Sequence, residues 1–149
     1  ALEPPVVAAR WLAQSLQHHF DEGLERPDAL VPVPLATRRL RQRGFNQAAL
    51  LARWLSGPLG IPCEENLLRR TQDTPAQQAL DARARQRNLR QAFALAPQAA
   101  LRNRHLALVD DVLTTGATAQ ALAALLCEAG AARVDVYCLA RTPKPGEPA

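Results

Sequence analysis

The sequence predicts an α/β fold in which a parallel sheet is flanked by helices. The main observation is a strand–loop–helix–strand pattern over residues 105–140, which implies two parallel strands joined by a right-handed crossover. The chain has 149 residues, of which 48% are hydrophobic and 21% are charged, and this length fits one domain. We therefore expect a single domain over residues 1–141, followed by a flexible tail at 142–149.

The first sixty residues predict two helices around one strand. Residues 4–22 have helical spacing and begin with two prolines, which suit a first turn. A strand is expected at 29–34, with its prolines at the end of the strand. A second helix is expected at 45–56, with Asn46 as its cap and a break at 57–62.

The elements after residue 62 end in the strand–loop–helix–strand unit. In order, the pattern predicts a strand within 63–70, a loop at 71–80, a helix from Asp81 that includes Leu89 and Phe93, a strand at 105–109, a loop at 110–116, a helix at 117–129 and a strand at 133–140. Ligands of parallel sheets bind beyond the carboxyl ends of the strands. The loop that follows residue 109 is therefore the first candidate for a functional site.

The composition excludes several classes of protein. No run of about 18 apolar residues is present, which excludes a transmembrane helix. The N-terminus lacks the basic and apolar regions of a secretory signal. The three cysteines form no C-x-x-C pair, so they encode neither a disulfide framework nor a zinc knuckle. We expect a cytoplasmic protein.

The basic residues point to an anionic ligand. Lysine and arginine together number 18, Lys144 is the only lysine, and the net charge is +4. Such a balance is compatible with nucleic acid and with any phosphorylated ligand. Arginine forks bind phosphate oxygens in pairs, and four arginines follow the strand at 29–34: Arg38, Arg39, Arg41 and Arg43. A solvated basic loop and a coding bias toward arginine are the alternatives.

The string LALVDDVLTTGAT at residues 106–118 carries the strongest functional signal. Asp110 and Asp111 directly follow an apolar strand, where two charges need solvent, a metal or a polyol. Carboxylates at a strand end accept hydrogen bonds from vicinal hydroxyls, as in ribose recognition. The threonines and glycine at 114–118 begin a helix, and its free N–H groups and dipole favour an anion. The loop therefore suits a sugar phosphate.

Other interpretations of this loop are weaker. Asp111 or Thr114 could simply cap the helix, although a cap needs only one such residue. A Walker phosphate loop and a dinucleotide fingerprint are both excluded, because their glycine motifs are absent.

Three strings resemble a known family. VDDVLTTGAT at 109–118 closely resembles the phosphoribosyl-pyrophosphate (PRPP) motif of type I phosphoribosyltransferases. VPVPLATRRLRQRGFNQAALLA at 31–52 and RRTQDTPAQQALDARARQRNLRQAF at 69–93 resemble the ComF/GntX branch, the competence protein F family. The resemblance spans about residues 31–141. It implies the Rossmann-like three-layer fold of type I phosphoribosyltransferases and a site for PRPP and Mg²⁺.

The resemblance also implies roles for particular residues. Asp110 and Asp111 would hold the ribose hydroxyls and, through water, a magnesium ion. The 5′-phosphate would lie against Thr114, Thr115, Gly116, Ala117 and Thr118. A pyrophosphate loop would contain Arg38, Arg43 and Gly44, and Arg43 would join the two aspartates as a catalytic residue. A mobile flap would include Thr71, Thr74, Gln77 and Gln78.

The sequence departs from the family pattern at three points. Members often begin with a four-cysteine zinc module, and its absence together with the missing start methionine leads us to expect that such a module is missing from this chain. Some purine enzymes have an aspartate where Thr114 stands here. The catalytic lysine that orotate enzymes carry in the flap is also absent.

Two functions remain open. In the first, the protein transfers phosphoribosyl from PRPP to an unknown nitrogen nucleophile, a nucleobase-like acceptor, and releases pyrophosphate. In the second, it is a non-catalytic accessory that responds to PRPP or nucleotides, or serves DNA uptake in competence, with single-stranded DNA or the uptake machinery as its partner. The sequence names no acceptor and leaves the oligomeric state open.

Overall fold

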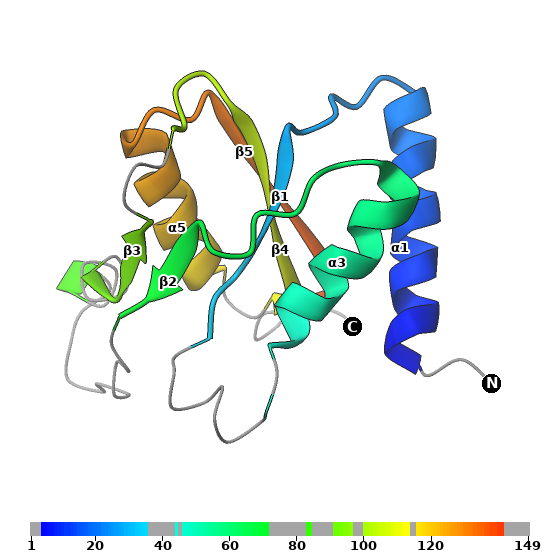
Figure 1. Ribbon diagram of the computed structural model, residues 1–149, viewed down its shortest axis with the longest axis horizontal. Helices are drawn as coiled ribbons and strands as arrows, with labels where there is room; N and C mark the ends of the chain where they lie inside the picture. The colour runs from blue at the N-terminus through cyan, green and yellow to red at the C-terminus, as the bar shows by residue number, and fades with distance from the viewer. Residues whose placement is uncertain are drawn as a thin grey trace.

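The computed structural model describes residues 4–35, 44, 46–71, 83–84, 91–96, 100–113 and 116–141. In chain order its elements are α1 (Pro4–Asp21), β1 (Ala29–Pro32), α3 (Gln47–Leu59), β2 (Leu68–Arg70), β3 (Phe93–Leu95), β4 (His105–Leu113), α5 (Ala117–Glu128) and β5 (Arg133–Arg141) (Figure 1). Across these ranges, we find no helix with both the length and the apolar character that a membrane span requires.

The main sheet has the strand order β1–β4–β5, and both pairings are parallel. Val31 lies opposite Leu108, and Val109 lies opposite Tyr137. This arrangement confirms the expected α/β fold with a parallel sheet flanked by helices. A second sheet, which we did not expect, is formed by β2 and β3 in antiparallel pairing.

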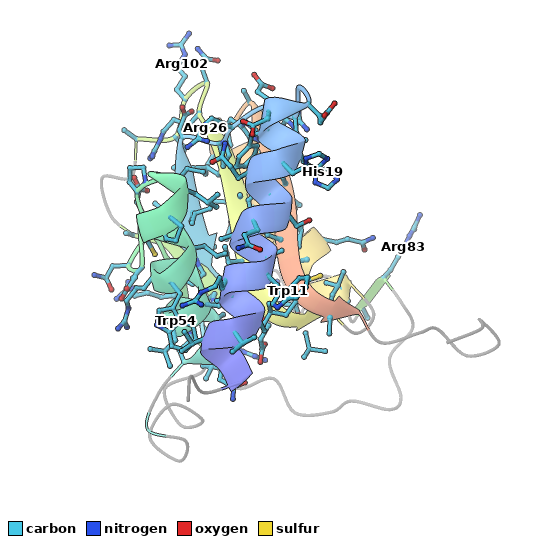
Figure 2. All side chains as sticks on the ribbon, turned by 90° about the vertical axis from the view of Figure 1, so that its right-hand side faces the viewer. Trp11, His19, Arg26, Trp54, Arg83 and Arg102 are labelled. Atoms are coloured by element: carbon cyan, nitrogen blue, oxygen red, sulfur yellow. The ribbon has the colours of Figure 1, made fainter. Side chains whose placement is uncertain are left out.

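Alternate residues of the central strands bury opposite faces of the main sheet. Ala107 and Val109 pack with side chains of α1 and α3, and Figure 2 shows these two helices side by side over one face. Leu106 and Leu108 pack with α5 and with the β2–β3 sheet. Because both faces are covered, the strand at 105–109 is a continuous apolar run rather than an alternating one.

The helices that follow adjacent strands leave the sheet in opposite directions. α3 follows β1 and packs on the face that α1 also covers, whereas α5 follows β4 and packs on the other face. In an open parallel sheet, this reversal leaves a crevice between the carboxyl ends of the two strands, where ligands bind. The fold therefore predicts a site beyond Pro32 and Val109.

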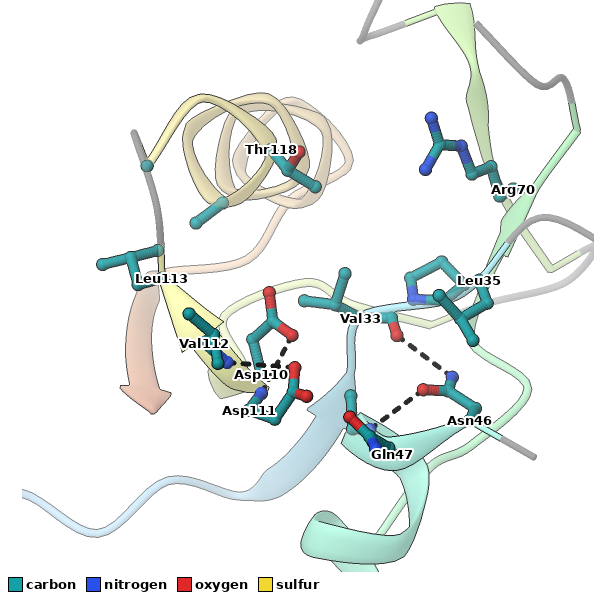
Figure 3. Close-up of a pocket in the computed structure, with 14 residues that line it drawn as sticks. Val33, Leu35, Asn46, Gln47, Arg70, Asp110, Asp111, Val112, Leu113 and Thr118 are labelled. Carbon is teal, nitrogen blue, oxygen red and sulfur yellow. Dashed lines mark hydrogen bonds between the residues drawn. The ribbon is translucent and has the colours of Figure 1, made fainter. Parts of the chain in front are cut away.

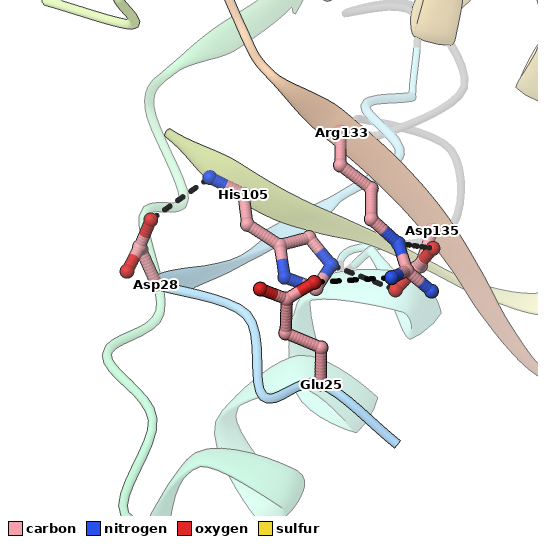
Figure 4. A network of polar contacts seen from close by, with 5 residues as sticks. All are labelled: Glu25, Asp28, His105, Arg133 and Asp135. Carbon is pink, nitrogen blue, oxygen red and sulfur yellow. Dashed lines mark hydrogen bonds and ion pairs between the residues drawn. The ribbon is translucent and has the colours of Figure 1, made fainter. Parts of the chain in front are cut away.

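A polar network closes the opposite, amino-terminal edge of the sheet (Figure 4). Asp135 accepts hydrogen bonds from His105 Nε2 at 2.7 Å and from Arg133 Nε at 2.9 Å. Asp28 accepts from the backbone N–H of His105 at 2.8 Å and donates its own N–H to the carbonyl of the same residue at 2.7 Å. These contacts link the starts of β1, β4 and β5, so they fix the strand register far from the crevice.

Asn46 connects the end of β1 to the start of α3. As expected, it caps the helix: its side-chain oxygen accepts from the N–H of Ala48 at 3.0 Å and of Ala49 at 3.4 Å. Its Nδ2 group donates to the carbonyl of Val33 at 3.1 Å. One amide therefore ties the chain after β1 to the helix that follows it.

Two expected helix boundaries are wrong. The helix at 45–56 continues through Gly57 and Pro58 to Leu59. Pro58 lies in the last turn, where it removes one hydrogen bond, and Gly60 ends the helix in the left-handed conformation with φ 66°. The helix expected from Asp81 does not include Phe93, which lies in β3 and pairs with Arg70.

The expected loop at 110–116 is also partly wrong. Strand β4 continues to Leu113, because Val112 and Leu113 still pair with the end of β5. The two aspartates are therefore part of the strand rather than of a loop after it. Sequence periodicity misses this extension, because the pairing partner lies about thirty residues further along the chain.

We predict that the Asn46→Ala variant unfolds about 1–2 kcal/mol more easily than the wild type, because it removes the cap of α3. Asn46→Asp keeps the capping oxygen and adds charge that suits a helix N-terminus but gives up the donation to the Val33 carbonyl, so it should lose less than Asn46→Ala does. Urea denaturation followed by circular dichroism measures both. Equal losses in the two variants would contradict the capping role.

Candidate functional site

The crevice at the carboxyl ends of β1 and β4 contains a pocket (Figure 3). Four segments of the main sheet and its helices, together with one residue of the second sheet, line it. The lining residues are Val33, Pro34, Leu35, Asn46, Gln47, Ala48, Arg70, Asp110, Asp111, Val112, Leu113, Gly116, Thr118 and Ala119. The pocket therefore lies where the strand order and the helix directions predict a ligand site.

Asp110 and Asp111 form the acidic side of the pocket. The N–H of Asp111 donates to Asp110 Oδ1 at 2.9 Å, and the N–H of Val112 donates to Asp111 Oδ1, also at 2.9 Å. Both carboxylates are half-buried. Ionised carboxylates only accept hydrogen bonds, so this side of the pocket suits hydroxyl donors or a cation.

The electrostatics of the pair are unusual. Burial, together with the hydrogen bond and charge of the neighbouring Asp111 side chain, raises the pKa of Asp110 to about 7. A hydrogen bond from the backbone N–H of Asp111 lowers the pKa of Asp110 and offsets part of this rise. The pair therefore resists carrying two negative charges until a cation or a set of hydroxyl donors lies beside it.

The N-terminus of α5 forms another side of the pocket. Gly116 precedes the helix in the left-handed conformation with φ 81°, which favours glycine, and among the described residues no side chain caps the helix. Thr118 lies in the first turn and lines the pocket. The first turn of a helix carries the positive end of the helix dipole, which favours an anion.

Arg70 enters the pocket from the second sheet. Its guanidinium lies 5.4 Å from the ring centroid of Phe93, a cation–π contact between β2 and β3. Figure 3 shows the guanidinium across the pocket from Thr118. The second sheet therefore adds a positive side chain to a site that the main sheet builds.

The structure brings together four of the expected site residues: Asp110, Asp111, Gly116 and Thr118 all line the pocket. Ala117 is the first residue of α5. Gly44 is exposed with φ 78°, and it is not among the lining residues. The other expected phosphate and pyrophosphate contacts lie outside the described residues, namely Thr114, Thr115, Arg38 and Arg43.

The first residue of the expected flap is held by the second sheet. Thr71 donates its backbone N–H and its hydroxyl to the carbonyl of Ala92, at 2.6 and 3.1 Å. It directly follows β2 and does not line the pocket. Thr74, Gln77 and Gln78 lie outside the described residues, so the flap stays a prediction.

Sequence reasoning missed several lining residues. The segment Val33–Leu35 continues β1 beyond its carboxyl end, and that position could have marked it as part of the site. Gln47 follows the cap residue Asn46 and shares that signal. Arg70 had no comparable signal, because its place in the pocket depends on how a separate two-stranded sheet packs.

Asp110 and Asp111 suit a magnesium ion that is bound together with a ligand. Mg²⁺ in proteins is often held by one or two carboxylates together with waters and substrate phosphates. Among the described residues, no group of three or more His, Cys, Asp or Glu side chains is placed to hold a metal. Asp110 and Asp111 therefore suit an ion that a bound ligand also coordinates, rather than a protein-only cage.

Proteins with similar sequences have names connected with DNA use and competence. The chain is 47% identical over 131 residues to DNA utilization protein YhgH of Escherichia coli K12, covering 88% of this chain and 57% of the relative. It is 43% identical over 119 residues to competence protein F of Haemophilus influenzae, covering 79% and 52%. It is 34% identical over 114 residues to competence protein ComFC of Bacillus subtilis, covering 76% and 44%.

Solved structures with a similar fold are phosphoribosyltransferases. A purine phosphoribosyltransferase from Pyrococcus horikoshii superposes with a TM-score of 0.56 at 20% identity, covering 91% of this chain and 72% of that one. Adenine phosphoribosyltransferase from Saccharomyces cerevisiae gives 0.58 at 16% identity, covering 90% and 68%. At these identities the likeness establishes the fold alone.

The relatives are longer than the chain. It spans about half the length of the curated relatives that it matches. No family model matches the chain. The identity to these relatives over most of the chain is nevertheless high, and the fold agrees with the motif at 109–118. The chain therefore belongs to the competence protein F family and has the type I phosphoribosyltransferase fold.

Proposed function

We propose that the pocket binds PRPP together with Mg²⁺, and that the protein transfers the phosphoribosyl group to a nitrogen nucleophile with release of pyrophosphate. One observation carries the proposal: Asp110 and Asp111 line the same pocket as the N-terminus of α5, in the crevice between β1 and β4. A ligand with vicinal hydroxyls at one end and a phosphate at the other matches both features. PRPP has this arrangement on its ribose ring.

The acidic pair supports the ribose part of the proposal. The backbone N–H groups of Asp111 and Val112 already bind one oxygen of each carboxylate, which orients both side chains. The remaining oxygens can accept from the 2′- and 3′-hydroxyls of ribose. Bound Mg²⁺ would offset the negative charge of the pyrophosphate leaving group.

In the proposed reaction, the bond from the anomeric carbon to the pyrophosphate oxygen breaks, and its electron pair leaves with pyrophosphate. The nitrogen lone pair of the acceptor forms the new bond to that carbon, and the acceptor's surplus proton passes to water. The anomeric carbon gains positive charge during this exchange. Carboxylates fixed near the ribose stabilise such charge, so positioning and electrostatics supply the catalysis.

The pyrophosphate contacts stay predictions for the loop after β1. Arg38 and Arg43 stand in the sequence between β1 and α3, and Arg43 is the expected catalytic arginine. Because β1 pairs in parallel with β4, its carboxyl end lies at the same edge of the sheet as Asp110. That placement supports a loop that reaches the pyrophosphate from the β1 side.

The names of the relatives favour a second candidate function. "DNA utilization protein" and "competence protein" suggest a role in handling DNA, and the net charge of +4 is compatible with a polyanionic partner. In this alternative the same site binds PRPP or a nucleotide without turnover. Aromatic residues make up only 4% of the chain, which disfavours a single-strand binder that stacks bases. Either function is expected in the cytoplasm.

We predict that replacing Asp110 and Asp111 together by Asn weakens binding of Mg²⁺ and PRPP by at least about 100-fold, because each carboxylate loses charge-assisted hydrogen bonds. Isothermal titration calorimetry measures this loss. The matched control is Asp21→Asn with Glu22→Gln, two exposed carboxylates at the other end of the sheet, and it should bind like the wild type. Retained affinity in the Asp110/Asp111 double variant would refute the ribose assignment.

Turnover separates the two candidate functions. If the protein is a transferase, incubation with PRPP, Mg²⁺ and a panel of nucleobases should release pyrophosphate with at least one base, above the rate without a base. A coupled pyrophosphate assay measures this release. PRPP binding without release by any base would favour the accessory function, and salt-sensitive binding of single-stranded DNA would support it further.

The acidic pair also predicts how stability depends on pH without ligand. Asp110 keeps its proton up to about pH 7 in the folded state, while the unfolded carboxyl releases it near pH 4. Between these values the folded state binds more protons, so stability falls as pH rises and the loss is complete above pH 7. Partial exposure and screening limit this effect to about 1–2 kcal/mol.

Asp110→Asn removes this dependence. Its melting temperature should gain roughly 2–6 °C on the wild type between pH 4 and pH 8, measured by calorimetry with a chelator present. The control variant Asp21→Asn replaces an exposed carboxylate and should follow the wild type. A difference between Asp110→Asn and wild type that does not change with pH would contradict the raised pKa.

A further inference from the structure

The described charges of the pocket do not by themselves suit a polyanion. Among the described residues that line it, Asp110 and Asp111 are acidic and Arg70 is the only positively charged side chain. A phosphorylated sugar carries several negative charges. Among the described residues of the pocket, Arg70 is therefore the side chain that can offset this charge, and Figure 3 shows it on the side away from the carboxylates.

Arg70 is held in place before any ligand arrives. Its guanidinium packs 5.4 Å from the centroid of the Phe93 ring, and Phe93 is 5% exposed, so the ring is a fixed support. Arg70 is half-buried, whereas its neighbour Arg69 is exposed. Successive residues of a strand point to opposite faces, which explains why only one of the two arginines lines the pocket.

We propose that Arg70 binds the 5′-phosphate of the sugar phosphate from the side opposite α5, so that the second sheet forms one wall of the phosphate subsite. This inference rests on the proposed function, because it assumes that α5 receives the 5′-phosphate. We choose the 5′-phosphate because Arg70 and Thr118, in the first turn of α5, line the same pocket, and Figure 3 draws them on facing sides of it. A guanidinium can give two parallel hydrogen bonds to phosphate oxygens.

This arrangement divides the binding of the 5′-phosphate between two parts of the fold. The backbone near Gly116 supplies N–H donors from the main domain, and Arg70 supplies charge from β2. Binding a phosphate would therefore draw the second sheet and α5 toward one ligand.

Calorimetric titration with ribose 5-phosphate tests the assignment, because this probe has the 5′-phosphate and no pyrophosphate. Arg70→Gln should weaken its binding by about 10- to 100-fold, the loss typical of charge-assisted hydrogen bonds. Arg69→Gln is the matched control: it removes the same charge from the neighbouring position of the same strand and should stay within about twofold of the wild type. Arg70→Lys keeps the charge without the fork and should give an intermediate loss.

A second titration with pyrophosphate and Mg²⁺ identifies which phosphate Arg70 binds. Arg70→Gln should change pyrophosphate affinity no more than Arg69→Gln does. A loss for pyrophosphate with ribose 5-phosphate spared would overturn the proposal, and so would equal effects of the two variants on ribose 5-phosphate. Thermal melting confirms that each variant is folded.

These titrations distinguish a failure of the Arg70 assignment from a failure of the proposed PRPP function. If the wild type binds PRPP with Mg²⁺ but the two arginine variants behave alike, only the role of Arg70 is wrong. If the wild type binds neither PRPP nor ribose 5-phosphate, the proposed function is wrong and the role of Arg70 is wrong with it.

Discussion

The parallel pairing of β1 with β4 is the constraint on which the site depends. It places the carboxyl ends of both strands at one edge, and the helices that follow leave on opposite faces of the sheet. The crevice that results cannot be filled by either helix, so polar groups can occupy it without being buried in the core. The amino-terminal edge is closed by the network of Asp28, His105 and Asp135, and this leaves the other edge for a ligand.

The chemistry of the crevice follows from the polar groups at the end of β4 and at the start of α5. Strand β4 continues past its apolar part into Asp110 and Asp111, and burial together with the neighbouring Asp111 side chain raises the pKa of Asp110 to about 7. The first turn of α5 offers backbone donors next to this acidic pair. Acceptors and donors within one pocket distinguish a sugar phosphate from a simple anion or a simple cation, and this contrast is the physical basis of the proposed function.

Much of the central fold could be predicted, because it depends on local patterns. The unit at 105–140 was readable from an apolar run, a glycine-bearing helix start and a second apolar run, and Asn46 was identifiable as a cap from its residue type. The end of β4 was not, since its last residues are strand only through pairing with the end of β5. The β2–β3 sheet and the place of Arg70 depend on contacts between distant segments, which periodicity does not report.

A crystal structure of the protein with PRPP and Mg²⁺ tests most directly whether the crevice between β1 and β4 is the PRPP site. We expect density for the ligand in the crevice between β1 and β4, with ribose hydroxyls within about 3.2 Å of Asp110 and Asp111 carboxylate oxygens and the 5′-phosphate against the N-terminus of α5. PRPP bound elsewhere, or bound in the crevice with its ribose turned away from both carboxylates, would contradict it.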